Sequence, residues 1–289
     1  MAAAATATLG YAAGVELRWF RLRRYEVPVL PQGRRPVRIL HISDAHLTPS
    51  QRRKMAWLRA LDATSPDLVV NTGDSIAHED AVPAFLSALG PLLDRPGVFV
   101  FGSNDYYAPQ LKNPFRYLWQ SGRLGEPPRG MLRLPWGDLR SRMTAAGWLD
   151  ATHRRHRLRV GDIDVEVTGV DDSHIGLDRY DTVAGPVDSG ADVHIGMMHS
   201  PEPANLDAFA ADGYELLLAG HTHGGQVCVP GYGAVITNCG IDRARARGLH
   251  RHNGAWLHVS AGLGTSPYAP IRFACPPEAT LLTLLPRVR

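Results

Sequence analysis

The chain has 289 residues, of which 44% are hydrophobic and 20% are charged, and this balance excludes a disordered protein and a membrane-spanning bundle. The formal net charge of +3 is too small an excess to indicate a surface for nucleic acid. The three cysteines have no C-x-x-C spacing, which excludes a disulfide framework and a zinc–thiolate site and fits a reducing, cytoplasmic compartment.

The N-terminal segment, residues 1–36, is predicted to be an extension outside the main domain. Residues 1–15 are apolar and rich in alanine, but they fall short of the about 20 residues that a transmembrane helix needs and lack the basic start of a secretory signal. A basic and aromatic stretch follows from Arg18 to Tyr25. This stretch either makes a peripheral contact with an anionic membrane surface or belongs to a helical extension packed on the domain.

Strands and helices are predicted to alternate in the next part of the chain. The strands are short apolar runs rich in β-branched residues, at 37–43, 68–70 and 98–101. Helical spacing of apolar residues separates them, at 50–64 and 81–93. Each strand is followed by a polar loop, and these loops contain Asp44, His46, Asp74, Asn104 and Asp105.

The middle of the chain is less regular, and we predict a proline-rich insertion beside the site at residues 106–147. A β-hairpin is expected at 158–168, around Gly161 and Asp162. Several short strands are expected between residues 255 and 285. No repeat or low-complexity linker interrupts the chain, so residues 37–289 are predicted to form a single domain.

Two further predicted strands, at 193–198 and 216–219, also end in polar loops, which contain His199, His221 and His223. Loops at the carboxyl ends of strands in open α/β sheets converge on one crevice. On an extended loop, residues i and i+2 point to the same side, so the D-x-H and H-x-H spacings would bring both side chains to one metal region.

These loops offer carboxylate oxygen, amide oxygen and imidazole nitrogen. That set suits Mn²⁺, Fe²⁺, Zn²⁺ or Mg²⁺ better than metals that prefer thiolates. Two ions about 3.5–4 Å apart need a bridging carboxylate and further ligands for each ion, and the five loops supply enough of them. The sequence therefore predicts two divalent metal ions.

In chain order the loops read D-x-H, G-D, G-S-N-D, H and G-H-x-H. This ordered set resembles the calcineurin-like metallophosphoesterase family, and in particular a bacterial branch with the pattern GHTHGGQ, present here from Gly220 to Gln226. The resemblance spans residues 39–285. It implies an α/β fold, a four-layer αββα sandwich of two β-sheets flanked by helices. It also implies a hydrolase that cleaves a phosphoester or phosphoanhydride bond with a hydroxide bridging two metal ions.

The resemblance also implies a role for each ligand. Asp44, His46 and His223 would hold the first metal ion, and Asp74 would bridge the two ions. Members of this branch often carry an N-terminal membrane anchor and include hydrolases of lipid-associated phosphates. The expected substrate is therefore a small-molecule or lipid-linked phosphate.

The second ion would be held by Asn104, His199 and His221, and Asn104 and His199 are also expected to act in catalysis. The family usually has Gly-Asn-His-Asp or Gly-Asn-His-Glu where this chain has Gly-Ser-Asn-Asp. Either Ser103 or Asn104 stands at the ligand position, and we favour Asn104 because an amide oxygen is the better donor. The usual general-acid histidine is missing. The leaving group would then take its proton from Asp105 or solvent, or depart unaided, as from a phosphoanhydride or aryl ester.

Three further residues are candidates for substrate binding. Tyr106 either stacks on a base or acyl chain of the substrate or packs in the core. His174 belongs to a turn with two aspartates, which either lines the cleft or forms a solvated cap. Arg243 either binds a substrate phosphate or belongs to a basic surface run. Two other functions stay open: a non-catalytic binding module with this fold, and a nuclease with a contiguous basic groove.

Overall fold

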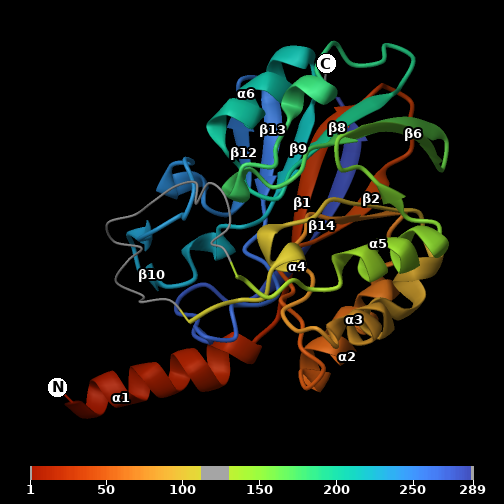
Figure 1. The fold of residues 1–289 in the computed structure, drawn as a ribbon. Coiled ribbons are helices and arrows are strands. Elements are labelled where there is room, and N and C mark those ends of the chain that lie inside the picture. Colours follow the sequence, from red (N-terminus) through yellow and green to blue (C-terminus); the bar gives the residue numbers. More distant parts are fainter. Residues whose placement is uncertain (1, 112–129, 288–289) are drawn as a thin grey trace.

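Two six-stranded β-sheets lie face to face in the middle of the molecule (Figure 1). The computed structural model describes residues 2–111 and 130–287. In spatial order, the first sheet contains β1 (Arg21–Leu30), β14 (Glu278–Pro286), β2 (Val37–Ile42), β3 (Leu68–Asn71), β4 (Gly97–Phe99) and β5 (Leu149–Asp150). The second contains β12 (Gly248–His252), β13 (Ala255–Val259), β9 (Leu216–Ala219), β8 (Val193–Met197), β7 (Ile163–Gly169) and β6 (Arg154–Val160).

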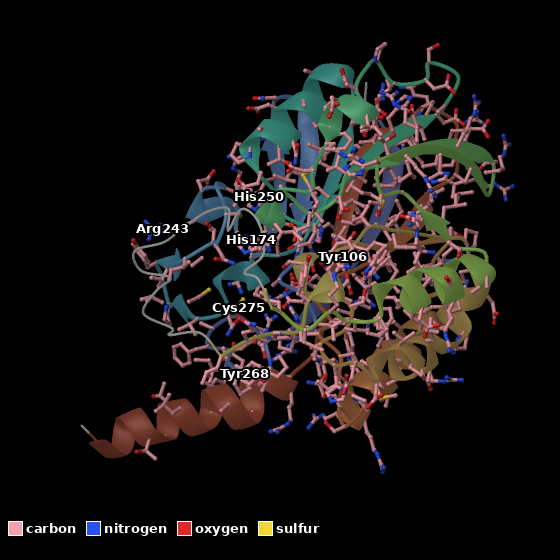
Figure 2. All side chains as sticks on the ribbon, in the orientation of Figure 1. Tyr106, His174, Arg243, His250, Tyr268 and Cys275 are labelled. Atoms are coloured by element: carbon pink, nitrogen blue, oxygen red, sulfur yellow. The ribbon has the colours of Figure 1, made fainter. Side chains whose placement is uncertain are left out.

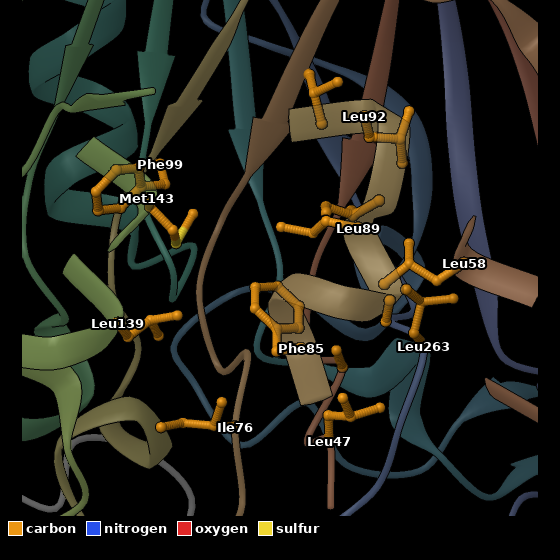
Figure 3. Packing of buried hydrophobic residues seen from close by; sticks show 14 of the residues in the cluster. Leu47, Leu58, Ile76, Phe85, Leu89, Leu92, Phe99, Leu139, Met143 and Leu263 are labelled. Carbon is orange, nitrogen blue, oxygen red and sulfur yellow. The ribbon is translucent and has the colours of Figure 1, made fainter. Parts of the chain in front are cut away.

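Helices cover the outer face of each sheet, which completes the predicted αββα layers. Helices α2 (Arg52–Ala60), α3 (Ala81–Leu89) and α5 (Trp136–Ala145) pack on the first sheet. Figure 3 shows this cluster, in which Phe85 and Leu89 of α3 and Met143 of α5 gather near Phe99 of β4. Helix α6 (Pro203–Asp212) packs on the second sheet through Phe209.

The space between the sheets is filled by short β-branched and aliphatic side chains. Val70 and Val98 of the first sheet lie in one cluster with Val167, Ile195 and Leu218 of the second, and all five are fully buried. Because these strands are buried on both faces, their sequences are continuously apolar rather than alternating. The prediction of buried strands from such runs is therefore confirmed.

Parallel pairing brings the ends of the central strands to one edge of the sandwich. Strands β2, β3, β4 and β5 are parallel to one another, and so are β7, β8, β9 and β13. The predicted hairpin is present as the antiparallel pair of β6 and β7. The segments that follow β2, β3, β4, β8 and β9 are the five polar loops of the sequence analysis.

Residues 21–30, which the sequence analysis placed in the N-terminal extension, form β1 and complete the edge of the first sheet. Strand β1 pairs in parallel with β14 from Arg21 opposite Glu278 onwards, and Val27 and Leu30 are fully buried. Before it, α1 (Ala2–Gly10), η1 (Tyr11–Val15) and η2 (Glu16–Arg18) form a helical segment whose first part projects from the body (Figure 1). Within the described ranges, no helix is both long and apolar enough to cross a bilayer.

Two other parts differ from the predicted pattern. Of the predicted insertion, residues 112–129 lie outside the described residues, while α5 belongs to the helix layer of the first sheet. Between residues 255 and 285 the structure has only β13 and most of the long β14, so the prediction of several short strands was wrong. The remaining short elements are η3 (Leu61–Thr64), η4 (Gly90–Asp94), α4 (Ser103–Tyr106), η6 (Ser173–Ile175), η7 (Tyr180–Thr182), η8 (His223–Gly225), β10 (Cys228–Val229), β11 (Gly233–Ala234) and η9 (Arg243–Arg245).

Candidate functional site

The five polar loops meet at the carboxyl ends of the central strands, and a first group of ligand atoms lies between the two sheets. The imidazole Nε2 of His46 is 3.2 Å from Nε2 of His223. Oδ1 of Asp44 is 4.0 Å from the first of these nitrogens and 3.6 Å from the second. Asp44 and His46 follow β2 of the first sheet, whereas His223 follows β9 of the second.

A second group overlaps the first. Oδ2 of Asp74 lies 3.4 Å from Nε2 of His199 and also 3.4 Å from Nε2 of His46. Oδ1 of Asp44 is 4.0 Å from the same nitrogen of His199. The carboxylate of Asp74, and with it that of Asp44, therefore lies between the two sets of imidazoles.

Asn104 and His221 border this second group. The backbone N–H and the side-chain amide of Asn104 donate to the two carboxylate oxygens of Asp74, at 2.8 and 2.7 Å. Nδ1 of His221 lies 3.4 Å from Nε2 of His199. Ser103 lies one residue away at the start of α4, so it is the Asn104 amide that contacts the shared carboxylate.

Five of these residues adopt backbone angles that residues other than glycine rarely adopt. The φ values lie between +41° and +69° for Asp44, His46, Asp74, His221 and His223. The left-handed region costs about 1–2 kcal/mol for such residues, and this cost concentrates at functional sites. The predicted reason for the D-x-H and H-x-H spacings, an extended loop, was therefore wrong. Tight left-handed turns direct the two side chains of each motif towards the metal centre.

Two glycines allow the loops to approach so closely. A Cβ on Gly102 would lie 2.3 Å from Oδ1 of Asp74, and one on Gly220 would lie 2.4 Å from Oδ2 of Asp44. Both distances are far inside van der Waals contact. Glycine is therefore needed at both positions because no larger residue fits beside the carboxylates.

Hydrogen bonds to main-chain carbonyls orient three of the imidazole rings. Nδ1 of His199 lies 2.8 Å from the carbonyl oxygen of Thr72, and Nδ1 of His223 lies 3.1 Å from that of Gly264. Each ring thus carries its proton on Nδ1 and turns Nε2 towards the carboxylates. His221 is reversed: its Nε2 lies 3.1 Å from the carbonyl of Asn238, which leaves Nδ1 facing the centre. Such bonds are typical of histidines that bind metal.

Burial and mutual contacts set the charges in the centre. Burial lowers the pKa of His46 and of His221 to about 4, so both rings are neutral near pH 7. Burial alone would raise the pKa of Asp74, but the ring of His199 outweighs it and holds that pKa well below its usual range. Burial also opposes the charged form of His199, whose pKa is nevertheless raised by Asp74 and other nearby carboxylates.

These features fit divalent cations. The ligand atoms of Asp44, His46 and His223 all lie within 4.8 Å of one another, and so do those of Asp44, Asp74 and His199. Among the described residues, histidines are the only partners within ion-pair distance of the two buried carboxylates. Closely spaced carboxylates and imidazoles, with no lysine or arginine within ion-pair distance of those carboxylates, are what a metal ion of the predicted class requires.

Asp105 does not face the centre, which contradicts its predicted role as proton donor. Its fully buried carboxylate accepts hydrogen bonds from the backbone N–H groups of Asp74, Ser75 and Gly102, at 2.8, 2.7 and 3.1 Å. Burial raises the pKa of Asp105 to about 7. These bonds tie the loop after β3 to the start of α4, so Asp105 positions Asp74.

Arg272 is a positioning residue that the sequence analysis missed. Its fully buried guanidinium donates to the carbonyls of Ala261 and Gly264, at 2.7 and 2.6 Å. The carbonyl of Gly264 also accepts a hydrogen bond from the imidazole of His223. These carbonyls belong to the loop after β13, and no short sequence motif shows that Arg272 binds them.

The three substrate-binding candidates end in different places. The ring of His174 lies 4.6 Å from that of His221, so this residue borders the centre. The hydroxyl of Tyr106 donates to the carboxylate of Asp171 and faces a neighbouring cavity. The guanidinium of Arg243 instead lies over the exposed ring of Tyr232, at 4.4 Å, and Figure 2 shows it at the far side from Tyr106. The structure does not bring Arg243 to the centre.

Comparisons with known proteins agree with this geometry. A family model described as calcineurin-like phosphoesterase matches residues 37–225. The metallophosphoesterase YkuE of Bacillus subtilis (strain 168) is 27% identical over 261 residues, or 89% of this chain and 82% of YkuE. A metallophosphoesterase of Aquifex aeolicus (strain VF5) is 27% identical over 285 residues, or 96% of each chain. The phosphodiesterase YaeI of Escherichia coli (strain K12) is 24% identical over 289 residues, or 98% of this chain and 94% of YaeI.

The region matched by the family model contains all the predicted ligands, from Asp44 to His223. The match confirms the resemblance drawn from the motif order, and with it the prediction of a metal-dependent hydrolase. The chain belongs to the calcineurin-like phosphoesterase family.

Proposed function

We propose that this protein hydrolyses phosphoester or phosphoanhydride bonds with two divalent metal ions held at the overlapping groups described above. The observation that carries the proposal is the shared position of Asp44 and Asp74 between two sets of imidazoles. Asp44, His46 and His223 would hold the first ion. Asn104, His199 and His221 would hold the second, with Asp74 between them.

When bound, two such ions lower the pKa of water to yield a nucleophile and neutralise the charge on the phosphoryl oxygens. The residues of the chain orient the ligands and keep them ready to bind. The carbonyls of Thr72, Gly264 and Asn238 hold three of the four imidazoles with the correct nitrogen turned inward. Asp105 holds the loop of Asp74 in place through backbone N–H groups. Little rearrangement is then needed when a phosphate group binds, which is the basis of electrostatic preorganisation.

We infer that the leaving group departs without a protein proton donor. The position usually held by histidine is occupied by Asn104 or Asp105, and the carboxylate of Asp105 is engaged by backbone N–H groups. Acidic leaving groups such as phosphate or phenolate need no such donor. A steep fall in kcat from p-nitrophenyl to phenyl and alkyl phosphodiesters would support this inference, and equal rates would contradict it.

The test of the main proposal is hydrolysis of bis(p-nitrophenyl) phosphate by purified protein with added Mn²⁺. We expect turnover that is abolished by a chelator and restored by Mn²⁺, and that is lost in Asp74→Asn. If the metal-loaded protein hydrolyses neither this diester, nor p-nitrophenyl phosphate, nor a nucleoside diphosphate conjugate, the proposal is wrong.

We also propose a peripheral membrane contact through the N-terminal segment. Leu9, Val15 and Trp19 are 61%, 55% and 47% exposed, and Arg18 and Arg21 lie beside them. Exposed apolar side chains next to basic residues suit an anionic lipid surface. Co-sedimentation with phosphatidylglycerol vesicles, but not with phosphatidylcholine vesicles, is the expected result. Equal recovery from both, or from neither, would count against the contact.

A further inference from the structure

The helical segment before β1 contacts the molecule beside the metal centre, and no role has yet been assigned to this contact. It packs against residues 272–275, which lie between β13 and β14. The carbonyl of Ala12 accepts a hydrogen bond from the backbone N–H of Arg272, at 3.1 Å. The ring of Tyr11 lies edge-on to that of Phe273, with centroids 6.3 Å apart. The start of the chain is therefore fixed next to the segment that supplies Arg272.

Glu16 makes the most specific part of this contact. It is only 2% exposed, and its Oε2 and Oε1 accept hydrogen bonds from the backbone N–H groups of Ala274 and Cys275, at 3.0 and 2.5 Å. No described lysine, arginine or histidine lies within ion-pair distance of this carboxylate. Figure 2 shows Cys275 on the side of the body where the N-terminal helix ends. Because a buried carboxylate is costly unless it is hydrogen-bonded, both oxygens of Glu16 are committed to this one turn.

The turn that Glu16 binds has an unfavourable backbone conformation. Ala274 has a φ of +52°, in the left-handed region that residues other than glycine rarely adopt. Such a conformation persists only where the surrounding contacts hold it. The N–H of Ala274 donates to Glu16, and its carbonyl accepts a hydrogen bond from Nη1 of Arg247, at 3.2 Å. Loss of the Glu16 carboxylate would leave the turn without one of these two contacts.

Arg272 connects this turn to a ligand of the metal centre. Its Nη1 donates to the carbonyl of Cys275, at 3.1 Å, so the turn also holds the guanidinium. Its Nη2 donates to the carbonyl of Gly264, at 2.6 Å, and Nδ1 of His223 lies 3.1 Å from the same oxygen. Within the described ranges, no carboxylate lies within ion-pair distance of Arg272. The position of its guanidinium is therefore set mainly by backbone carbonyls.

Cys275 provides a second, shorter connection. Its fully buried thiol lies 3.3 Å from the carbonyl oxygen of His223 and 3.5 Å from that of Gly224. A thiol is a weak donor, so this contact adds to the route through the guanidinium and does not replace it. Both routes end at His223. Neither passes through His199 or His221, the proposed ligands of the second ion.

We propose that Glu16 is a positioning residue for the first metal ion. Its carboxylate holds the turn at Ala274 and Cys275, and through Arg272 and Cys275 this turn fixes both the ring and the backbone of His223. The inference rests on the proposed function, because His223 is there a ligand of the first ion. It gives the N-terminal segment a role in metal binding that is separate from the proposed contact with a membrane.

The first test measures metal affinity, which does not depend on hydrolysis. Metal-free protein is titrated calorimetrically with Mn²⁺. We expect Glu16→Ala to raise one of the two Kd values at least tenfold and to leave the other within threefold. Glu16→Gln keeps one acceptor oxygen, so its Kd should lie between those of Glu16→Ala and the unmodified protein. Glu16→Gln also carries the comparison if Glu16→Ala does not fold. An unchanged Mn²⁺ affinity in both variants would overturn the inference.

Glu166→Ala is the matched control for the loss of a buried carboxylate. Glu166 on β7 is 3% exposed, and it too accepts a backbone N–H, that of Asp188 at 2.6 Å. Its other described partners are the side chains of Arg155, Tyr214 and His194, none of which is a proposed metal ligand. We expect both alanine variants to unfold at lower urea concentration, but only Glu16→Ala to bind Mn²⁺ more weakly. Equal effects on Mn²⁺ affinity would show a general response to lost stability and refute a positioning role.

A double-mutant cycle tests the route through His223. In His223→Ala the ligand is already lost, so the addition of Glu16→Ala should change the Mn²⁺ affinity by less than threefold. A further tenfold loss in the double variant would mean that Glu16 acts on another part of the centre, contrary to the inference. If Mn²⁺ binding depends on Glu16 in this way but the unmodified protein hydrolyses no phosphate ester, the inference stands and only the proposed function is refuted.

Discussion

At the scale of single residues, the metal centre is a strained arrangement that its neighbours hold in place. The left-handed turns at Asp44 and His46 are fixed by backbone hydrogen bonds to Gly73 and Asp74, both 2.9 Å long. The turn of His223 is fixed through the carbonyl of Gly264. The positions of the ligand atoms therefore depend on the residues packed around these turns as well as on the ligands themselves.

Gly102→Ala is expected to abolish activity with a modest loss of stability. Its Cβ would lie 2.3 Å from Oδ1 of Asp74 and 2.8 Å from the ring of His199, so the carboxylate must move away from its position. We expect kcat for bis(p-nitrophenyl) phosphate to fall at least a hundredfold. Gly137→Ala is the control, because a Cβ on this helical glycine would have no neighbour within 4 Å. Full activity in Gly102→Ala would show that the loops are looser than described.

Asp74→Asn should lower both metal binding and activity. The substitution keeps the shape of the side chain but removes the charge shared by His46, His199 and a bound cation. We expect a loss of at least one bound metal per chain by elemental analysis and a fall in kcat/KM of about a thousandfold, or about 4 kcal/mol of transition-state stabilisation. Asp80→Asn, with a side chain that is 79% exposed, should change neither quantity. Two metals retained in Asp74→Asn would argue against its bridging role.

Most ligands of the centre could be predicted from sequence because each follows a short, apolar strand. The strand ends could be located from local composition, and the order of the motifs supplied the rest. Asp105 was assigned wrongly, since a carboxylate beside a metal loop resembles a catalytic acid until its hydrogen bonds to backbone N–H groups are known. Arg272 could not be found, because no motif shows that its guanidinium turns back onto the carbonyls of Ala261 and Gly264.

At the scale of elements, a buried pair of histidines joins the two sheets. Nδ1 of His41 on β2 lies 2.8 Å from Nδ1 of His258 on β13, and Nε2 of His41 lies 2.9 Å from the hydroxyl of Thr72. Both rings are fully buried. Burial lowers the pKa of His41 to about 3 and that of His258 well below its usual range. The pair is therefore neutral in the folded protein.

This pair predicts a loss of stability in mild acid. Below about pH 6.5 the unfolded chain binds protons at these histidines and the native state does not, so the free energy of unfolding falls as the pH drops. The slope is about 1.4 kcal/mol per pH unit for each histidine, and for His41 it persists down to about pH 3. Urea unfolding of metal-free protein between pH 7 and 4.5 measures it.

His41→Gln should reduce this slope by the contribution of one histidine. A glutamine amide can replace both hydrogen bonds of His41 but does not titrate. His78→Gln, at an exposed histidine with a side chain that is 48% exposed, is the control and should leave the slope as it is. The same slope in His41→Gln and in the unmodified protein would mean that other groups dominate the acid response.

Among the elements, those in strand–helix–strand units could be predicted, because short continuous apolar runs alternate with segments that have apolar residues at helical spacing. The pairing of β1 with β14 could not be predicted. This strand carries Arg21, Arg23 and Arg24, so it looks like a solvated or membrane-facing segment in sequence. Its place is decided by pairing with β14, about 250 residues away, and by an ion pair between Arg23 and Glu278. Nothing local encodes that contact.

At the scale of the whole molecule, the metal centre joins the two halves of the sandwich. Asp44 and Asp74 follow strands of the first sheet, whereas His199, His221 and His223 follow strands of the second. Without a cation, the two buried carboxylates of the first sheet repel each other, and burial raises the pKa of Asp44. A bound ion would therefore relieve the repulsion between the carboxylates, and its bonds to the ligands would connect the two sheets.

Metal binding should consequently stabilise the entire fold. An ion present at about a hundred times its Kd adds about 2.7 kcal/mol to the free energy of unfolding, which corresponds to a rise in Tm of about 5–10 °C for a domain of this size. Differential scanning calorimetry with Mn²⁺ and with a chelator measures the rise. Asp74→Asn should show less than half of it, while Asp80→Asn should match the unmodified protein. Because the ligands come from both sheets, the transition should shift as a single peak; a local change without a shift in the main peak would mean that the ions do not hold the sheets together.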